Sequence, residues 1–372
     1  MYINQFTATS LRSLDFITLN PNKHINIILG KNNAGKTSVL EGIFYASSLK
    51  SFKSVPPASL IANKSNELKI LIKYSKSSEN AAISIEKSLK SPIVKKINDE
   101  RASTKQLLEA FPVLALNFGS SNIISGSSED RRSLLDWGSF HVEHSYLDLY
   151  KDYTKSLKQR NSLLKKNELS NIDYWTELVS ILGSKISTIR NAYFNELNSM
   201  FENIKVEMQN LLPNIYADIK ESKITYNQGW PIDLSLKESL KNNLTKDMVL
   251  KHTTTGPHRA DIIFTAGPGD LKNVSSMSTQ IISSLLVIMS QARVFHVKHE
   301  HSPIILIDDL FFGIDDKNLQ LVINLLKSSK AQCFITAPDL YRDKLEDIIG
   351  NNNVQMYIFD NNKLVDINND KQ

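Results

Sequence analysis

A glycine-rich loop near the N-terminus constrains the fold of this chain more than any other feature. The residues Ile28–Leu40 read ILGKNNAGKTSVL, and Gly30–Thr37 match the pattern G-x-x-x-x-G-K-[ST]. The apolar run Ile25–Leu29 before the loop is typical of a buried strand, and Thr37–Ser47 after it has helical character. A strand, a glycine-rich loop and a helix in this order predict an α/β fold that binds nucleotide phosphates.

The loop residues have distinct predicted roles. The glycines allow the backbone to wrap closely around phosphates, and the helix that follows turns its positive end towards them. We expect Lys36 to reach the β- and γ-phosphates of ATP and the hydroxyl of Thr37 to ligate Mg²⁺. The residues predicted to hold the nucleotide are Gly30, Lys31, Asn32, Asn33, Ala34, Gly35, Lys36, Thr37 and Ser38.

A second apolar run ends in two carboxylates. Ile304–Ile307 is followed by Asp308 and Asp309. Beside a phosphate-binding loop, Asp308 is predicted to hold Mg²⁺ at the end of a buried strand, and Asp309 is a candidate to orient the attacking water. The alternative is an ordinary strand whose end is solvated.

Strand and helix patterns along the chain indicate two kinds of structure. Runs typical of strands occur near both ends, including Gln332–Ala337 and Val354–Asp360. Between them, Tyr146–Lys166 lacks helix breakers, and Asp173–Leu212 carries apolar residues every three to four positions. These features predict a parallel sheet interrupted by a helical arm, with an ordinary helical subdomain as the alternative.

Composition and charge limit the binding partners and the cellular compartment that we expect for this chain. The formal net charge of +5 permits a polyanionic partner, and the single Cys333 excludes an internal disulfide. We expect a cytoplasmic protein with no membrane segment, because the N-terminus lacks a secretory signal and no run approaches the length of a membrane span. Basic residues that are candidates for DNA contact, with a solvated surface as the alternative, are Lys50, Lys53, Lys151, Lys155, Lys158 and Arg160.

Several segments together resemble the RecF family of SMC-like ABC ATPases. They are GKNNAGKTSVLEGIF, RRSLLDWGSFHVEH (Arg131–His144), LKQRNSLL (Leu157–Leu164), GPHRAD and LIDDLFFGID. The resemblance implies an α/β P-loop NTPase head of the ABC type, formed from both chain ends, with an inserted, mainly α-helical arm. The expected bounds are 1–132 and 250–372 for the head and 133–249 for the arm.

The resemblance also implies a role. The family binds single- and double-stranded DNA at gaps in an ATP-dependent manner, without sequence preference, in recombinational repair and replication-fork maintenance. The family takes part in the response to DNA damage (the SOS response). RecO and RecR are the implied partners in loading RecA, and an ATP-dependent homodimer is the implied assembly.

Three departures from the family pattern fall on the dimer's composite active site. The signature Ser-Arg-Gly-Gln is replaced by Met277-Ser278-Thr279-Gln280, so Ser278 and Gln280 are its remnants. The family's Ser-Glu-Leu-Asp reads Phe312-Gly313-Ile314-Asp315, and Leu114 stands at the expected place of a glutamine. These changes predict a weak ATPase at most. The alternative function is a hydrolysis-impaired scaffold that binds nucleotide and docks DNA or repair partners; a transporter subunit fits poorly, because the helical insertion has no place there.

Overall fold

The structure is a computed structural model that describes residues 1–53, 55–77, 79–118, 123–211, 219–311, 314, 316–349 and 354–365. The chain divides into two compact units, 1–122 with 295–372, and 123–294. The second unit is wider than the expected arm, 133–249, because α3 (Ser128–Val142) packs against α5 (Ile172–Leu211) and β10 (Asp261–Ala266). Each unit is described by itself below.

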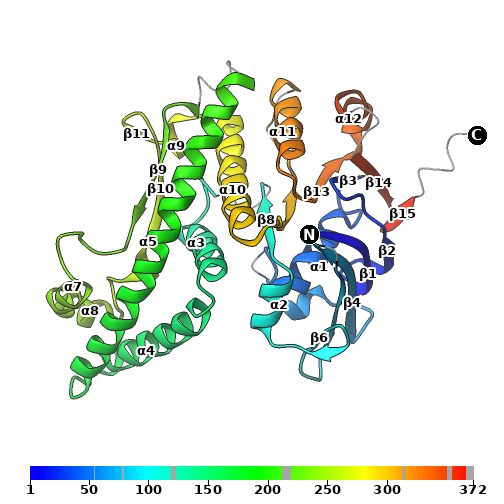
Figure 1. The fold of residues 1–372 in the computed structure, drawn as a ribbon. Helices are drawn as coiled ribbons and strands as arrows, with labels where there is room; N and C mark the ends of the chain where they lie inside the picture. The colour runs from blue at the N-terminus through cyan, green and yellow to red at the C-terminus, as the bar shows by residue number, and fades with distance from the viewer. Residues whose placement is uncertain are drawn as a thin grey trace, which may run out of the picture. The chain divides into compact units, whose positions relative to one another are not determined.

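The first unit contains the parallel sheet that the sequence predicts. The strand order is β15-β14-β3-β13-β12-β8, and every neighbouring pair is parallel except β14 with β15. Figure 1 shows β3, β13 and β14 side by side. The strands β3 and β12 are buried throughout and apolar except for Asn26 and Asp308, as expected where both faces of a sheet are covered. The strands are β3 (Ile25–Gly30), β8 (Val113–Asn117), β12 (Ile304–Asp308), β13 (Cys333–Pro338), β14 (Val354–Asp360) and β15 (Lys363–Val365).

A second sheet in this unit is entirely antiparallel, with the order β2-β1-β4-β5-β6-β7. Its strand β4 alternates exposed and buried residues, so one face of the sheet meets the core. The lysine-rich stretch 87–105 completes β5 and contains β6 and β7. The strands are β1 (Tyr2–Leu11), β2 (Leu14–Leu19), β4 (Glu67–Lys76), β5 (Glu79–Ser88), β6 (Val94–Ile97) and β7 (Glu100–Arg101).

One helix lies in the core between these two sheets. α1 (Lys36–Ser48) contacts β1 and β4 of the antiparallel sheet and β12 and β3 of the parallel sheet. The core joins Phe6 and Leu11, Ile43 of α1, and Ile28 and Leu306 in one buried cluster. This packing fixes the start of α1 against the ends of the parallel strands. The remaining helices of the unit are η1 (Pro57–Leu60), α2 (Thr104–Ala110), α11 (Asp316–Ser328), η3 (Asp339–Tyr341) and α12 (Arg342–Ile349).

The second unit contains the two long helices that the sequence predicts. α4 (Tyr146–Lys166) and α5 pack against each other and are joined by the short segment 167–171. A three-stranded sheet, β11-β10-β9, shows that the unit is not purely helical. The other elements are β9 (Ser222–Asn227), α7 (Leu236–Asn242), α8 (Leu244–Leu250), η2 (Pro257–Arg259), β11 (Gly269–Asp270), α9 (Leu271–Val274) and most of α10 (Met277–His299).

The helix α10 bears on the expectation that the chain has no membrane segment. It is the one helix among the described residues that is long and apolar enough to cross a membrane, with a mean hydropathy of 1.3 in its most apolar window. That window is 78% buried inside the structure, as in the core helix of a soluble protein. The length and apolarity of α10 are therefore explained by burial against protein.

Candidate nucleotide-binding site

The phosphate loop, residues Gly30–Ser38, leads from the carboxyl end of β3, an interior strand of the parallel sheet, into α1. A Cβ atom added to Gly30 would lie 2.4 Å from the carbonyl oxygen of Phe359, so no side chain fits there. Gly35 has a φ of +92°, and a Cβ atom there would lie 2.7 Å from Cδ2 of Leu14. Both glycines of the motif are thus required by the local packing and backbone.

The remaining loop residues divide by exposure. Lys31, Asn32 and Asn33 are exposed, whereas Ala34 and Ser38 are buried. The loop closes through the N–H of Ala34, which donates to the carbonyl of Lys31 at 3.2 Å. The first turn of α1 carries no acidic side chain, so the positive end of the helix is not neutralised locally.

Lys36 points back over its own loop. Its Nζ donates to the carbonyl oxygens of Gly30, at 2.7 Å, and Lys31, at 2.8 Å. Burial lowers the pKa of Lys36, and the carboxylates of Asp309 and Asp308 act in the opposite direction. An ammonium has three donors, so two are used on the loop and one is left to bind an anion at its centre.

Asp308, the last residue of β12, is held by two threonines, one at the start of α1 and one near the carboxyl end of β13. Its Oδ1 accepts hydrogen bonds from Thr37 of α1, at 2.9 Å, and from Thr336 of β13, at 2.8 Å. Its Oδ2 is buried and has no hydrogen-bond partner among the described residues. Burial raises the pKa of Asp308, and the hydrogen bond from Thr336 opposes that change. The predicted partners Thr37 and Asp308 are therefore in direct contact.

Two polar residues near this carboxylate were missed by the sequence reasoning. Asn117 of β8 pairs with Asp308 of β12. Leu114, which stands where the family pattern has a glutamine, pairs instead with Ile305 in the middle of the strand. Thr336 also receives the N–H of Asp309, at 2.9 Å. The signal for Asn117 and Thr336 is their position near the carboxyl end of a parallel strand next to β12, which depends on the strand order.

A lysine from outside the motif also approaches the site. Nζ of Lys53 lies 4.0 Å from Oδ2 of Asp308, although the sequence reasoning grouped Lys53 with candidates for DNA contact. The segment that carries Lys53 follows α1 and is tied to Glu41, a buried carboxylate of that helix, through Ser51.

The signature remnant lies at the start of α10. Ser276 caps the helix by accepting the N–H of Thr279 at 3.2 Å, and Thr279 itself is buried. The side-chain amide of Gln280 donates to the carbonyls of Lys272, at 3.1 Å, and Ser275, at 3.4 Å. Gln280 therefore binds the segment before its own helix. Ser278 is half-buried.

The segment that replaces the family's Ser-Glu-Leu-Asp is only partly described. Its residues Phe312, Gly313 and Asp315 lie outside the described residues.

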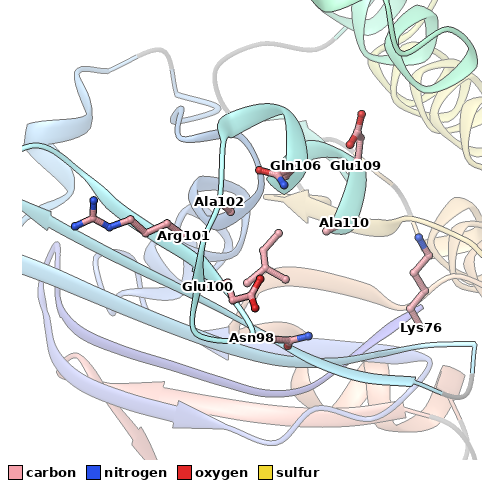
Figure 2. A pocket seen from close by; sticks show the side chains of 9 residues that line it. Lys76, Asn98, Glu100, Arg101, Ala102, Gln106, Glu109 and Ala110 are labelled. Atoms are coloured by element: carbon pink, nitrogen blue, oxygen red, sulfur yellow. The ribbon is translucent and has the colours of Figure 1, made fainter.

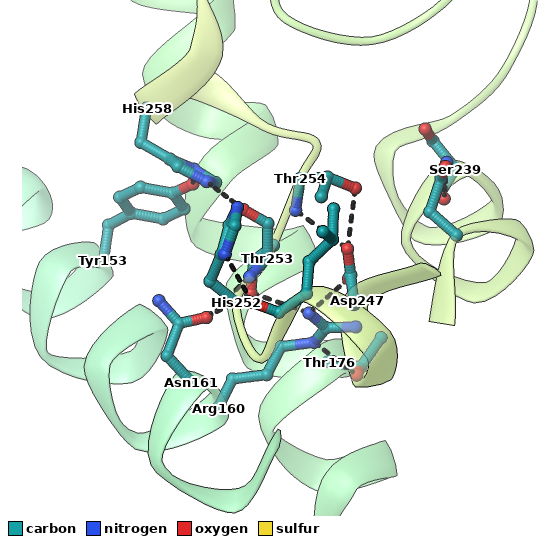
Figure 3. A network of polar contacts seen from close by, with 12 residues as sticks. Tyr153, Arg160, Asn161, Thr176, Ser239, Asp247, His252, Thr253, Thr254 and His258 are labelled. Carbon is teal, nitrogen blue, oxygen red and sulfur yellow. Dashed lines mark hydrogen bonds and ion pairs between the residues drawn. The ribbon is translucent and has the colours of Figure 1, made fainter. Parts of the chain in front are cut away.

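The structure contradicts one of the predicted DNA contacts. Arg160 and Asp247 form an ion pair at 2.8 Å, and both side chains are 0% exposed. Arg160 also donates to Thr176, at 3.0 Å, and Thr253, at 2.7 Å, so it joins α4 and α5 to the segment before η2 (Figure 3). A side chain in this network cannot reach DNA, because α4 turns Arg160 to its buried face.

The three lysines of α4 that were predicted to contact DNA occupy the other face of the helix. Lys151, Lys155 and Lys158 are exposed, and Lys151 pairs with Asp148 at 3.0 Å. His258, from the segment GPHRAD, has a structural role in the second unit. Its Nδ1 lies 2.7 Å from the hydroxyl of Tyr153, and burial lowers the pKa of His258 to about 4.

A shallow pocket in the first unit lies away from the phosphate loop. Its lining residues come from the end of β4, the β6–β7 turn and α2 (Figure 2). Lys76 and Arg101 are mixed there with Glu100 and Glu109, and no residue of the phosphate loop lines it. This pocket therefore adds nothing to the nucleotide site.

Comparisons with known proteins agree with the fold and with the motifs. Residues 2–362 match the family described as the RecF/RecN/SMC N-terminal domain. The "DNA replication and repair protein RecF" of Coxiella burnetii is 31% identical over 340 residues, which cover 91% of this chain and 93% of that protein. The protein of the same name from Pseudoalteromonas translucida is 30% identical, over 91% of this chain and 92% of the relative.

Solved structures show the same architecture. The recombination mediator protein RecF-ATPrS of the RecFOR pathway has a TM-score of 0.78 at 22% identity, covering 98% of this chain and 97% of that one. The Smc head domain from Pyrococcus furiosus bound to ScpA has a TM-score of 0.56 at 14% identity, covering 98% and 96%. The α/β ABC-type fold is therefore confirmed, and the chain belongs to the RecF group of the RecF/RecN/SMC family.

Proposed function

We propose that this RecF-type DNA replication and repair protein binds ATP at the phosphate loop and uses it to control binding to DNA. The observation that carries the proposal is the contact between Thr37 and Asp308, 271 residues apart in the chain, at the mouth of a glycine-rich loop. Strand order and loop packing bring together the two groups that such a site needs for a metal-bound nucleoside triphosphate.

The phosphates are held by this chain's own donors. Backbone N–H groups of the loop and the start of α1 supply a positive end, and Lys36 adds a positively charged donor. Because two N–H groups of Lys36 bind the loop carbonyls, the side chain is already oriented before a ligand arrives. This arrangement favours a polyphosphate over a single phosphate group.

The residues present also fit Mg²⁺. Its preferred ligands are oxygens, and the Thr37 hydroxyl and the Asp308 carboxylate provide them, with one carboxylate oxygen buried and without a hydrogen-bond partner among the described residues. No group of three or more His, Cys, Asp or Glu in the described part of the chain is placed to hold a metal, so phosphate oxygens would complete the set. Bound there, Mg²⁺ would neutralise charge on the β- and γ-phosphates.

Hydrolysis is proposed to be weak. Asp309 is the residue that we propose to orient a water, since it follows Asp308 in the chain and its charge acts on Lys36. The partner's signature helix would supply Ser278 and Gln280 in an ATP-dependent homodimer, but the amide of Gln280 is already bound within its own chain. Loss of one such charge-stabilising contact typically slows the chemical step by about two to three orders of magnitude.

DNA contact is proposed for the exposed lysines of α4. Lys155 and Lys158 lie on the same solvent-facing side of the helix as Lys151, and no base-reading module is evident. Binding to single- and double-stranded DNA is therefore expected to be sequence-independent and salt-sensitive. By analogy with the RecFOR pathway named for a related structure, RecO and RecR are proposed as partners in loading RecA, in the cytoplasm.

The second candidate function is a scaffold that binds ATP without cutting it and docks DNA or repair partners. The degraded signature Met277–Gln280 favours it, because Thr279 is buried where the family has glycine. Both candidates share the phosphate loop and differ only in turnover.

ATP hydrolysis by the purified chain, with and without gapped DNA, separates the two functions. Lys36→Ala is the control that removes the phosphate-binding donor. DNA-stimulated turnover that the control lacks supports the ATPase, whereas nucleotide binding without turnover supports the scaffold. Absence of any nucleotide binding by the unaltered chain would contradict both.

A further inference from the structure

A buried carboxylate oxygen of the nucleotide site has a cation beside it. Oδ2 of Asp308 is buried without a hydrogen-bond partner among the described residues, and Nζ of Lys53 is the ammonium that forms an ion pair with it, at 4.0 Å. The distance is too long for a hydrogen bond but within the range of an ion pair. The Lys53 side chain is 37% exposed and that of Asp308 is 1% exposed, so the ammonium lies at the boundary between the site and solvent.

Lys53 owes its place to a buried carboxylate. Glu41, on α1, forms a bidentate ion pair with Arg12, at 2.8 and 3.0 Å, and accepts a hydrogen bond from the Ser51 hydroxyl at 2.6 Å. That hydroxyl in turn accepts the backbone N–H of Lys53 at 3.0 Å. An unbroken series of contacts therefore runs from the β1–β2 turn, which carries Arg12, to the carboxylate of Asp308.

We propose that Lys53 occupies the charge position of the metal beside Asp308 until a metal arrives, with Glu41 as its positioning residue. This inference rests on the proposed binding of ATP with Mg²⁺. A divalent cation on Oδ2 would repel the ammonium, so Lys53 and the metal compensate the same oxygen in alternation.

A measurable consequence follows for nucleotide affinity. Without a metal, Asp308 repels the phosphates unless Lys53 neutralises it, so binding of the free nucleotide depends on Lys53. With Mg²⁺ in place, that neutralisation is no longer needed. A lysine that simply binds a phosphate would instead contribute equally under both conditions.

The test measures the dissociation constant of a fluorescent ATP analogue in excess Mg²⁺ and in EDTA. Lys53→Ala is compared with the unaltered chain and with Lys50→Ala, which removes the same charge from an exposed position in the same segment. We expect Lys53→Ala to weaken binding about fivefold in EDTA, as for a partly screened ion pair, and not at all in Mg²⁺. Equal weakening in both media, or no difference from Lys50→Ala, overturns the proposal.

The role of Glu41 is tested through Ser51. Ser51→Ala keeps the Glu41–Arg12 ion pair and cuts the link to Lys53, so it should reproduce the EDTA-specific loss without unfolding the site. Combined with Lys53→Ala, it should add nothing, because both changes act on one ion pair. Full additivity, or a loss that is the same in Mg²⁺, would reduce Glu41 to a purely structural role.

A nucleotide-free measurement separates failure of this inference from failure of the proposed function. In EDTA without nucleotide, Lys53→Ala should lower the melting temperature by about 2 °C more than Lys50→Ala does. If the unaltered chain binds no analogue, the proposed function fails, and the melting temperatures alone decide the inference. Equal melting temperatures for the two variants would overturn it.

Discussion

Replacing Asp247 by alanine leaves Arg160 as an uncompensated charge inside the second unit. Both side chains are 0% exposed, so water cannot take over the role of the carboxylate. Asp247 Oδ1 also accepts the N–H of Thr254 at 2.9 Å and its hydroxyl at 2.7 Å, and both bonds are lost. Removal of one partner of a buried ion pair costs about 3–5 kcal/mol of unfolding free energy, and we expect Asp247→Ala to fall in that range.

The chain offers a selective probe for this experiment. All three tryptophans, Trp137, Trp175 and Trp230, lie in the second unit, so their fluorescence during urea unfolding reports on that unit alone. A double variant, Arg160→Met with Asp247→Leu, removes both charges and should recover the part of the loss that comes from the uncompensated charge, because apolar replacement of a buried pair is often neutral. The two bonds from Thr254 stay broken in it. A loss below about 1 kcal/mol for Asp247→Ala would refute the assignment of Arg160 to the core.

Three further predictions concern the second unit. In Gly138→Ala, the new Cβ would lie 1.9 Å from Cζ of Tyr193, so urea unfolding should show a loss of about 1–3 kcal/mol, and an unchanged midpoint would contradict this packing. Burial lowers the pKa of His258 to about 4, below its value of about 6.5 in the unfolded chain; its contribution to stability is therefore complete above pH 6.5 and is lost as the pH falls towards 4. His258→Gln should flatten this pH profile of the unfolding midpoint, and identical profiles would count against the reasoning. Lys155→Ala and Lys158→Ala should each lower the salt dependence of DNA affinity by about 0.9 in log–log slope, while an unaltered slope would place the DNA elsewhere.

Local patterns predicted the elements that are buried and regular. The strands β12 and β14 and the helices α4 and α5 lie where their apolar runs or periodicity placed them, within one or two residues. At the end of β12, the structure brings Thr37 and Asp308, which were each predicted to ligate Mg²⁺, within hydrogen-bond distance of each other. These results need only the order of strand, loop and helix, which the chain itself carries.

The error at Arg160 has a physical cause that is visible in the sequence. A helix turns by about 100° per residue, so Lys151, Lys155 and Lys158 share a face while Arg160 lies about 160° from Lys158. The sequence reasoning grouped Arg160 with the lysines by nearness along the chain. Its partner Asp247 is 87 residues away, and no local pattern signals that pair.

The missed residues of the site depend on strand order, which local patterns do not contain. β13 lies between β3 and β12, so Thr336 reaches Asp308 from one side, and β8 on the other side brings Asn117 next to it. Neither residue belongs to a motif. From the sequence alone, each is an ordinary polar residue within or at the end of a strand. Lys53 is a stronger case, because it becomes part of the site only through the Glu41 contacts that hold its segment. The motif therefore predicts where phosphates bind, whereas the groups that balance the charge of Asp308 follow from tertiary packing.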